Sequence, residues 1–245
     1  MNALPLPSTH PRYRHEAKYL CTSGMLEVIE HRLRPLMQLD SHSRDGDYTV
    51  SSLYFDDYRD SCCADNEAGI GVRHKYRVRV YNDDAGYMRL EKKAKCNGLC
   101  RKTSSPLDAC AYRSMYAGDG IGLIRHSDHP LLKEFGAMIC SRLYRPKIIV
   151  RYTRKAFVYI QGDVRVTLDR NITVSTQTEC FPSEHEKMLS FPALDRGLHL
   201  LELKHTDILP YYIYQTIQMN TLQRVTFSKY YIGRKAARQF GGGIA

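Results

Sequence analysis

Charged and apolar side chains alternate along several short segments of the chain. Between Arg73 and Tyr81, cations occupy every second position, and the positions between them become apolar toward Val78 and Val80. Successive side chains of a strand point to opposite faces, so this segment predicts a strand with one cationic and one apolar face. Similar charged faces are predicted at residues 14–18, 89–95, 165–169 and 202–204. Several strands are therefore expected to share a charged face that includes carboxylates.

Turn signals and helical periodicity predict the other elements. Asp83-Asp84-Ala85-Gly86 and Gln161-Gly162 are typical of hairpin turns, and Asn97-Gly98 is the strongest hairpin signal in the chain. Strands are predicted at residues 13–21, 48–56, 72–82, 87–95, 99–104, 147–159, 163–174 and 198–205. Helices are predicted from Thr22 or Ser23 to 37, at 106–116, 129–143 and 210–220, and from 228 onward. Residues 57–71 form a polar segment, and 178–196 are expected to be irregular.

These elements favour one α+β domain. Residues 1–11 contain three prolines and are expected to form an irregular leader, and no repeat or low-complexity linker divides residues 12–240. Eight mostly antiparallel strands suit a closed barrel, which leaves no exposed edge. The helices must bury their apolar stripes against the apolar strand faces. We therefore expect a closed eight-stranded antiparallel tunnel with helices packed outside and a polar, cationic interior.

Composition restricts the partners. The chain carries 36 Lys and Arg against 26 Asp and Glu, a formal charge of +10, which favours polyanions such as nucleotides, polyphosphate, nucleic acid or an anionic membrane surface. It has no zinc-finger spacing, RNA-recognition motif or basic tail, so sequence-specific nucleic-acid binding is not expected. Its apolar runs are far shorter than the roughly 20 residues of a membrane span. Eight cysteines without a signal-peptide pattern favour reduced thiols and a cytoplasmic protein.

The predicted interior needs a polyanion. Cations two residues apart on a strand lie about 7 Å apart, and each such pair repels by roughly 2 kcal/mol at an effective dielectric of about 20. Six or more converging cations would cost on the order of 10 kcal/mol, comparable with the stability of a whole domain. Phosphate groups would compensate them, and Glu16, Glu91 and Glu202 are suited to a divalent metal that accompanies the phosphates.

In their order and spread, these motifs resemble the catalytic domain of the vacuolar transporter chaperone (VTC) complex and its stand-alone bacterial relatives, within the triphosphate tunnel metalloenzyme superfamily. The matching elements are Arg14-x-Glu16-x-Lys18-Tyr19, Ser52-x-Tyr54-Phe55-Asp56, Lys75-Tyr76-Arg77-x-Arg79-x-Tyr81, Leu90-Glu91-x-Lys93-x-Lys95, Arg101-Lys102, Arg165-x-Thr167-x-Asp169, Leu201-Glu202-x-Lys204, and Phe227-Ser228-Lys229-Tyr230 with Gly233.

The resemblance implies a tunnel that binds ATP with Mn²⁺ or Mg²⁺ and from which a growing polyphosphate chain leaves. It assigns catalytic positions to Arg77, Arg79, Lys93 and Arg165, and it gives Glu202 to the metal, with Glu16 and Glu91 as further metal candidates. Which of Lys93 and Lys95, and which of Arg101 and Lys102, faces the tunnel stays open. The phosphate-binding candidates are Lys18, Lys75, Lys95, Arg101, Lys102, Lys204 and Lys229.

The first strand favours a polymerase. It reads Arg-x-Glu-x-Lys, whereas hydrolytic tunnel enzymes look like Glu-x-Glu-x-Lys there; the change replaces a carboxylate by a cation. We therefore expect transfer of the γ-phosphate of ATP to polyphosphate, with release of ADP. The alternatives are a tunnel-type inorganic triphosphatase or nucleotide phosphohydrolase, and a non-catalytic module that binds polyphosphate, pyrophosphate or inositol phosphates. The oligomeric state is left open.

Overall fold

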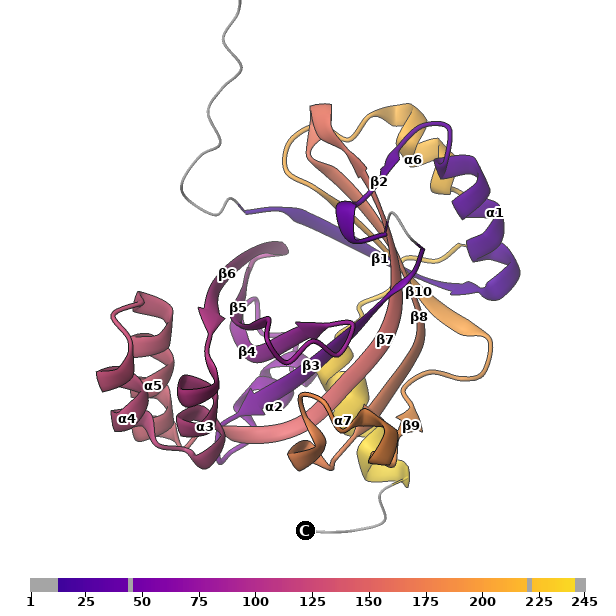
Figure 1. Cartoon of the computed structure of the whole chain (residues 1–245). Helices are drawn as coiled ribbons and strands as arrows, with labels where there is room; N and C mark the ends of the chain where they lie inside the picture. Colours follow the sequence, from indigo (N-terminus) through magenta and orange to yellow (C-terminus); the bar gives the residue numbers. More distant parts are fainter. Residues whose placement is uncertain (1–12, 44–45, 220–221, 241–245) are drawn as a thin grey trace, which may run out of the picture.

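One strongly curved antiparallel sheet organises the chain, whose computed structural model describes residues 13–43, 46–219 and 222–240 (Figure 1). The expected leader at 1–11 lies outside the described residues. Short strands β2 (Gln38–Leu39) and β9 (Phe191–Pro192) pair with two long strands, β7 and β8. The main path runs β1 (His15–Thr22), β10 (Leu198–His205), β8 (Val164–Ser175), β7 (Arg145–Tyr159), β3 (Tyr48–Asp56), β4 (Val72–Tyr81), β5 (Met88–Cys96) and β6 (Leu99–Leu107).

The two ends of this path, β1 and β6, do not form a continuous ladder. Arg14 and Cys100 exchange two backbone hydrogen bonds of 2.8 and 2.9 Å. Further along β1, residues 222–228, which we call the seam segment, replace β6 as the neighbour of this strand. Here the Val225 N–H donates to the Lys18 carbonyl at 2.8 Å. The closed barrel expected from the sequence is therefore not confirmed. The sheet stays open because β6 reaches only the start of β1 and the seam segment occupies the edge beyond it.

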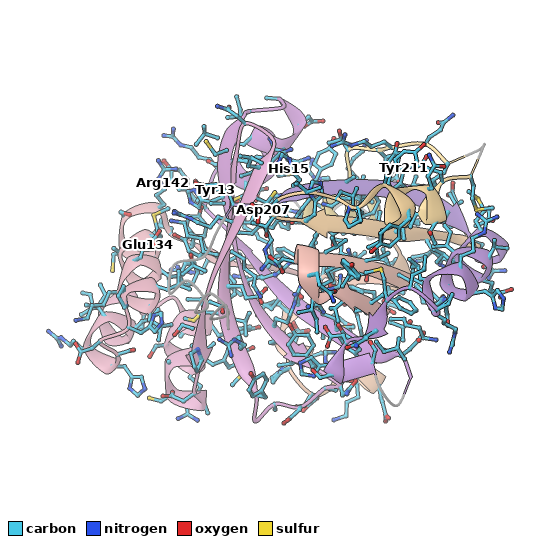
Figure 2. All side chains as sticks on the ribbon, turned by 90° about the horizontal axis from the view of Figure 1, so that it is seen from above. Tyr13, His15, Glu134, Arg142, Asp207 and Tyr211 are labelled. Atoms are coloured by element: carbon cyan, nitrogen blue, oxygen red, sulfur yellow. The ribbon has the colours of Figure 1, made fainter. Side chains whose placement is uncertain are left out.

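Two groups of helices cover the convex face of the sheet, at opposite ends of the molecule (Figures 1 and 2). Helices α1 and α6 pack on β1, β10 and β8 through side chains such as Ile29, Ile213 and Leu201. Helix α5 packs Phe135 against Phe55, with ring centroids 5.3 Å apart. The helices are α1 (Ser23–Leu33), α2 (Ser61–Glu67), α3 (Ala109–Ala117), α4 (Gly120–His126), α5 (Pro130–Arg142), α6 (Tyr211–Ile217) and α7 (Lys229–Phe240). Helix α4 was not predicted from the sequence.

Helix α7 departs from the expectation that all helices pack outside. A Cβ at Gly233 would lie 2.8 Å from the side chains of Ile148 and Val174, so only glycine permits this approach to the sheet. Ile148 pairs with Tyr54 across the β3–β7 ladder, and the Tyr54 ring lies 5.4 Å from that of Tyr230. These residues share the concave face. Helix α7 therefore covers one end of the space enclosed by the concave face, which we call the lumen. Its first residues lie at the cavity described below.

Because of a bulge, β8 directs side chains into the lumen at both of its ends. Val174 pairs with Val150, whereas Asp169 pairs with Arg154, and the register shifts between these pairs. Asn171 in this stretch adopts a positive φ of 52°. The shift changes which side chains face inward, because side chains alternate along a strand. Val174 thus supports α7, while Asp169 enters the polar part of the lumen.

Among the described residues, no helix is long and apolar enough to cross a membrane. The eight cysteines all lie in this part of the chain and are free thiols.

Candidate functional site

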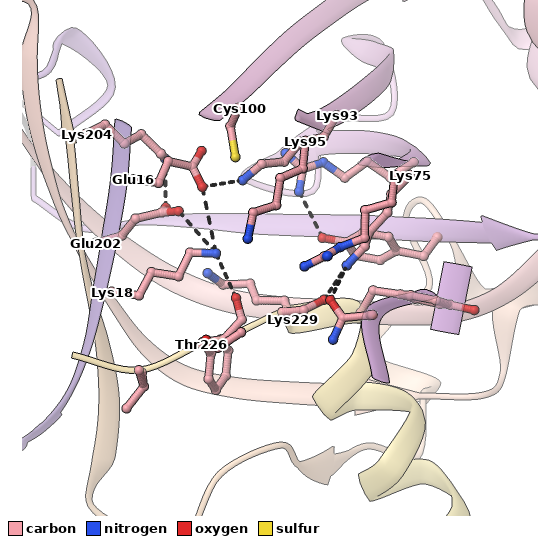
Figure 3. A pocket seen from close by; sticks show the side chains of 18 of the residues that line it. Glu16, Lys18, Lys75, Lys93, Lys95, Cys100, Glu202, Lys204, Thr226 and Lys229 are labelled. Atoms are coloured by element: carbon pink, nitrogen blue, oxygen red, sulfur yellow. Dashed lines mark hydrogen bonds and ion pairs between the residues drawn. The ribbon is translucent and has the colours of Figure 1, made fainter. Parts of the chain in front are cut away.

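A cavity of about 240 Å³, the inner cavity, opens on the concave face of the sheet (Figure 3). Strands β1, β3, β4, β5, β6, β7 and β10 contribute to it, together with α2, the seam segment and the start of α7. Its lining contains eleven Lys and Arg side chains but only two carboxylates, so the lining itself leaves a large excess of positive charge. The structure brings ten sequence-predicted site residues together here: Glu16, Lys18, Lys75, Arg77, Arg79, Lys93, Lys95, Glu202, Lys204 and Lys229.

The two carboxylates of the lining are held by lysines from three strands. Lys93 donates to Glu16 at 2.6 Å, and Lys204 lies 2.7 Å from Glu202. The Lys18 ammonium sits between the two carboxylates, at 3.8 Å from Glu16 and 3.7 Å from Glu202. Burial opposes ionisation of Glu202, but Lys204 and Lys18 hold the pKa of that carboxyl well below its usual value. Burial and the neighbouring Lys93 lower the pKa of Lys18.

Glu91 organises two arginines from behind the cavity wall. This carboxylate is fully buried and does not line the inner cavity. It accepts from Arg77 Nε at 2.8 Å, lies 3.4 Å from Arg79 Nη1, and accepts from Lys102 at 2.8 Å. The Arg77 guanidinium also donates to the hydroxyl of Tyr54 at 2.9 Å. Glu91, together with the hydroxyl groups of Tyr54, Ser52 and Tyr152, therefore fixes two guanidinium groups that line the inner cavity.

Arg154 is a lining residue that the sequence analysis missed. It donates two hydrogen bonds to Asp169, of 2.6 and 2.8 Å, and Lys229 donates a third at 2.6 Å. Burial opposes ionisation of Asp169, yet Arg154 and Lys229 lower its pKa to about 2. Arg154 shares its strand face with Ile148, Val150 and Tyr152, so no charged alternation marks it in the sequence.

Lys75 lies near the α7 side of the inner cavity and donates to the hydroxyl of Ser228 and to Asn66. Burial, with a smaller contribution from Lys18 and Lys93, lowers the pKa of this ammonium to about 7. A similar cause acts on Lys204: burial lowers its pKa to about 8 even though Glu202 opposes the shift. Both lysines therefore sit where a bound anion would favour their charged form.

Three other predicted cations lie outside the inner cavity. Arg165 pairs with Asp40 at 2.6 Å and donates to Tyr48 at 3.3 Å. Lys102 is held by Glu91, and the exposed Arg101 lies over the ring of Tyr13 at 5.1 Å. Lys93 and Lys95 both line the cavity, so the alternative between them does not arise.

Glu16 and Glu202 can be tested as a metal-binding pair. Within the described residues, no group of three or more His, Cys, Asp or Glu side chains is arranged around a common metal position. The two carboxylates flank the same ammonium and both face the inner cavity. Two hard oxygen donors fit Mg²⁺ or Mn²⁺ when the remaining ligands are water and phosphate oxygens. Glu91, engaged by three cations behind the wall, does not join this pair.

Comparisons with known proteins give one family match and several structural matches. The model of the VTC domain family matches residues 13–238. No curated protein matches the sequence. Among solved structures, HpAC1 from Hippeastrum, assigned as an adenylyl cyclase and found to have a dominant triphosphatase activity, superposes with a TM-score of 0.56 at 13% identity, covering 91% of this chain and 95% of its own. It shows a shared fold.

Two further structures are more distant. An assigned adenylate cyclase from Bacillus halodurans has a TM-score of 0.47 at 12% identity and covers 85% of this chain and 87% of its own. The PH1819 protein from Pyrococcus horikoshii OT3 has a TM-score of 0.45 at 11% identity, covering 90% and 96% of the two chains.

Proposed function

Because this chain belongs to the VTC domain family, we propose that it transfers the γ-phosphate of ATP to a growing polyphosphate chain and releases ADP. The observation that carries the proposal is the lining of the inner cavity, eleven cations against two carboxylates. Such an excess of positive charge requires a ligand with several negative charges. A nucleoside triphosphate and a polyphosphate chain both supply them.

The reaction needs positioning more than covalent participation. An oxygen of the terminal phosphate of polyphosphate forms a bond to the γ-phosphorus, and the bond from that phosphorus to the β–γ bridging oxygen breaks, so ADP leaves with the electron pair. Arg77, Arg79 and Arg154 hold the transferring group in line and neutralise its oxygens, since each guanidinium is already oriented by a buried carboxylate. Lys18, Lys93 and Lys229 hold the neighbouring phosphates.

Mg²⁺ or Mn²⁺ would be held by Glu16 and Glu202. When bound, it neutralises charge on the nucleotide oxygens and eases departure of the diphosphate. Lys18 lies between these carboxylates and would compete with the metal for them. Its ammonium, which donates to the Phe227 carbonyl at 2.7 Å, lines the inner cavity, where it would contact a bound phosphate.

Cations beyond the inner cavity support a path for the product. Arg165 neighbours Lys204 across the β8–β10 ladder and therefore shares its face. Lys102 faces Lys93 across the β5–β6 ladder. We assign both, together with Lys95 of the inner cavity, to the path of the product chain. Arg101 stays a peripheral phosphate candidate because it is exposed at the edge of β6.

The first strand also supports transfer over hydrolysis. Arg14 lies 3.2 Å from Asp163 and does not line the inner cavity, so β1 supplies a single carboxylate, Glu16, to the lining. Compared with the Glu-x-Glu-x-Lys pattern of hydrolytic tunnel enzymes, this strand has one carboxylate fewer, so fewer groups can bind and activate water. A triphosphatase is nevertheless the second candidate function, because the structurally similar HpAC1 is described as having a dominant triphosphatase activity.

The test is incubation of the purified protein with ATP and Mn²⁺ or Mg²⁺. A polymerase yields ADP and an acid-labile polymer that exopolyphosphatase degrades. Free phosphate with ADP, and no polymer, would instead identify a triphosphatase, and binding without turnover would identify a binding module. Glu202→Gln should abolish metal-dependent turnover. The matched control is Glu134→Gln, which removes a carboxylate paired with Lys92 away from the cavity lining.

A further inference from the structure

A second cavity, of about 350 Å³, lies beside β1 and α6, and we call it the outer cavity. Its chemistry differs from that of the inner cavity. Apolar side chains and aromatic rings dominate the lining, with one cation, Arg224, and one carboxylate, Glu16. Figure 2 labels two residues of this side of the molecule, His15 on β1 and Tyr211 on α6. The outer cavity is thus poorly suited to a chain of phosphates and well suited to a flat, weakly charged group.

The two cavities adjoin each other at the seam of the sheet. Both are lined by Glu16 and Arg224. In the described part of the chain, β1 makes backbone pairs across the seam at Arg14 and again at Lys18 and Tyr19. The stretch between these contacts includes Glu16. One ligand can therefore extend from the inner to the outer cavity past Glu16, with Arg224 beside it in both.

The outer cavity offers a hydrogen-bond donor and flat surfaces. The Gln218 side-chain nitrogen, Nε2, is buried and approaches the hydroxyl of Tyr19 without well-aligned hydrogen-bond geometry, so its N–H groups can still serve an acceptor on a ligand. The rings of His15 and His205 stack with centroids 4.9 Å apart, and the ring of Tyr214 joins them in the lining. Aromatic faces and an amide donor are the groups that recognise a heteroaromatic base.

We propose that the outer cavity binds the purine base of the nucleotide whose triphosphate occupies the inner cavity; this rests on the proposed function. Gln218 Nε2 donates to a ring nitrogen of the base, and Tyr214 with the two histidines packs against its face. Arg224, at the junction, contacts the phosphate nearest the ribose. The aromatic residues of the inner cavity do not compete for this role, since Tyr54, Tyr152, Phe227 and Tyr230 are all at most 7% exposed. The nucleotide therefore enters and leaves through the seam.

Photolabelling locates the base directly. The intact protein is irradiated with 8-azido-ATP and the modified peptide is identified by mass spectrometry. We expect the adduct within residues 209–219 or 222–224, the stretches that carry Tyr214, Gln218 and Arg224, and expect excess ATP to prevent it. An adduct near Asn66 or Arg73, on the α2 side of the inner cavity, would place the base there and overturn the proposal.

Binding measurements then separate base recognition from phosphate recognition. Gln218→Ala should weaken ATP binding about tenfold, the value of one hydrogen bond, and leave the affinity for inorganic triphosphate unchanged. Gln215→Ala is the matched control, because this exposed glutamine lies on α6, three residues before Gln218, and outside the lining. Equal losses for both ligands, or no loss for either, would contradict the assignment. If Gln218→Ala fails to fold, Gln218→Met removes the donor with a similar size and no added charge.

These two experiments do not depend on turnover. If the unmodified protein makes no polymer from ATP, the proposed polymerase function fails, while the adduct position and the ratio of ATP to triphosphate affinity still decide where the base binds.

Discussion

The ammonium of Lys93 on β5 donates a 2.6 Å hydrogen bond to the carboxylate of Glu16 on β1, two strands that are not neighbours in the sheet. This ion pair spans the lumen beside the seam where the sheet fails to close. It therefore links the two ends of the curved sheet through side chains, where the backbone of the described residues contributes the Arg14–Cys100 bridge.

Glu16→Gln should destabilise the ligand-free protein by about 1–3 kcal/mol, because the partly buried Lys93 loses its compensating charge. The same change should strengthen metal-free binding of triphosphate, since a negative charge leaves the lining. Urea denaturation with and without triphosphate measures both effects. Lys92→Met, which breaks the more exposed pair with Glu134, is the control and should change triphosphate affinity little. Weaker metal-free binding in Glu16→Gln would contradict the assignment of this carboxylate.

Glu91→Gln should cost about 3–5 kcal/mol of folding free energy, since Arg77 and Arg79 would keep their charges without a buried counter-ion. The concentration of divalent metal required for half-maximal activity should stay the same in whatever activity remains, because Glu91 lies behind the wall. Chemical denaturation and a metal titration provide the two readouts. A large shift in metal requirement with little loss of stability would instead make Glu91 a metal ligand.

Anion binding should be coupled to proton uptake. Burial lowers the pKa of Lys75 to about 7, and a bound phosphate favours its charged form, so the lysine takes up a proton on binding at pH 8. Affinity for triphosphate should therefore fall as pH rises above 7, by at most about tenfold per pH unit for each proton taken up. Calorimetry in buffers of different ionisation enthalpy measures the uptake.

The variant Lys75→Met should remove most of this coupling and leave the smaller share that comes from Lys204, whose pKa is about 8. The ligand-free protein should show a related effect on stability. Because the folded pKa of Lys75 lies below its unfolded value, the penalty is complete below pH 7 and disappears as pH rises toward 10. Binding enthalpies that do not depend on the buffer would refute the coupling.

Asp40→Asn should release Arg165, which Asp40 holds at 2.6 Å. If Arg165 contacts the product chain, the variant should bind polyphosphates of many units more tightly than the unmodified protein does, with little change for inorganic triphosphate, which is confined to the inner cavity. Competition against a fluorescent polyphosphate measures the ratio of the affinities for polyphosphate and for inorganic triphosphate. In the double variant Asp40→Asn with Arg165→Met, the gain should disappear; its persistence would show that Arg165 is not involved.

The alternating strands were predictable because one face is charged and the other buried. The hairpin of β4 and β5 was predicted at residues 72–82 and 87–95, and it occupies Val72–Tyr81 and Met88–Cys96. Local turn chemistry and side-chain periodicity determine such a hairpin, so a single sequence contains the information.

Three features depended on contacts distant in sequence. Arg154 was not predicted as a site residue because the same face of β7 is apolar at Ile148 and Val150, where α7 covers the strand. A cation appears on this face only at Arg154 itself. The position of α7 on the concave face follows from the close approach at Gly233, which no periodicity reveals. Closure of the barrel depended on competition for the edge of β1, where the seam segment pairs with Lys18 and displaces β6 from that stretch.

The wall of the inner cavity is completed by pieces from both ends of the sequence. Strand β1 pairs with β10 along its whole length, and the seam segment and Lys229 follow β10 in the chain. During synthesis, the cationic face of β4 and β5 therefore emerges from the ribosome long before the residues that shape it into a site. The site is therefore complete only once Lys229 has been synthesised, so a ligand that needs all of these elements could bind only to the nearly finished domain.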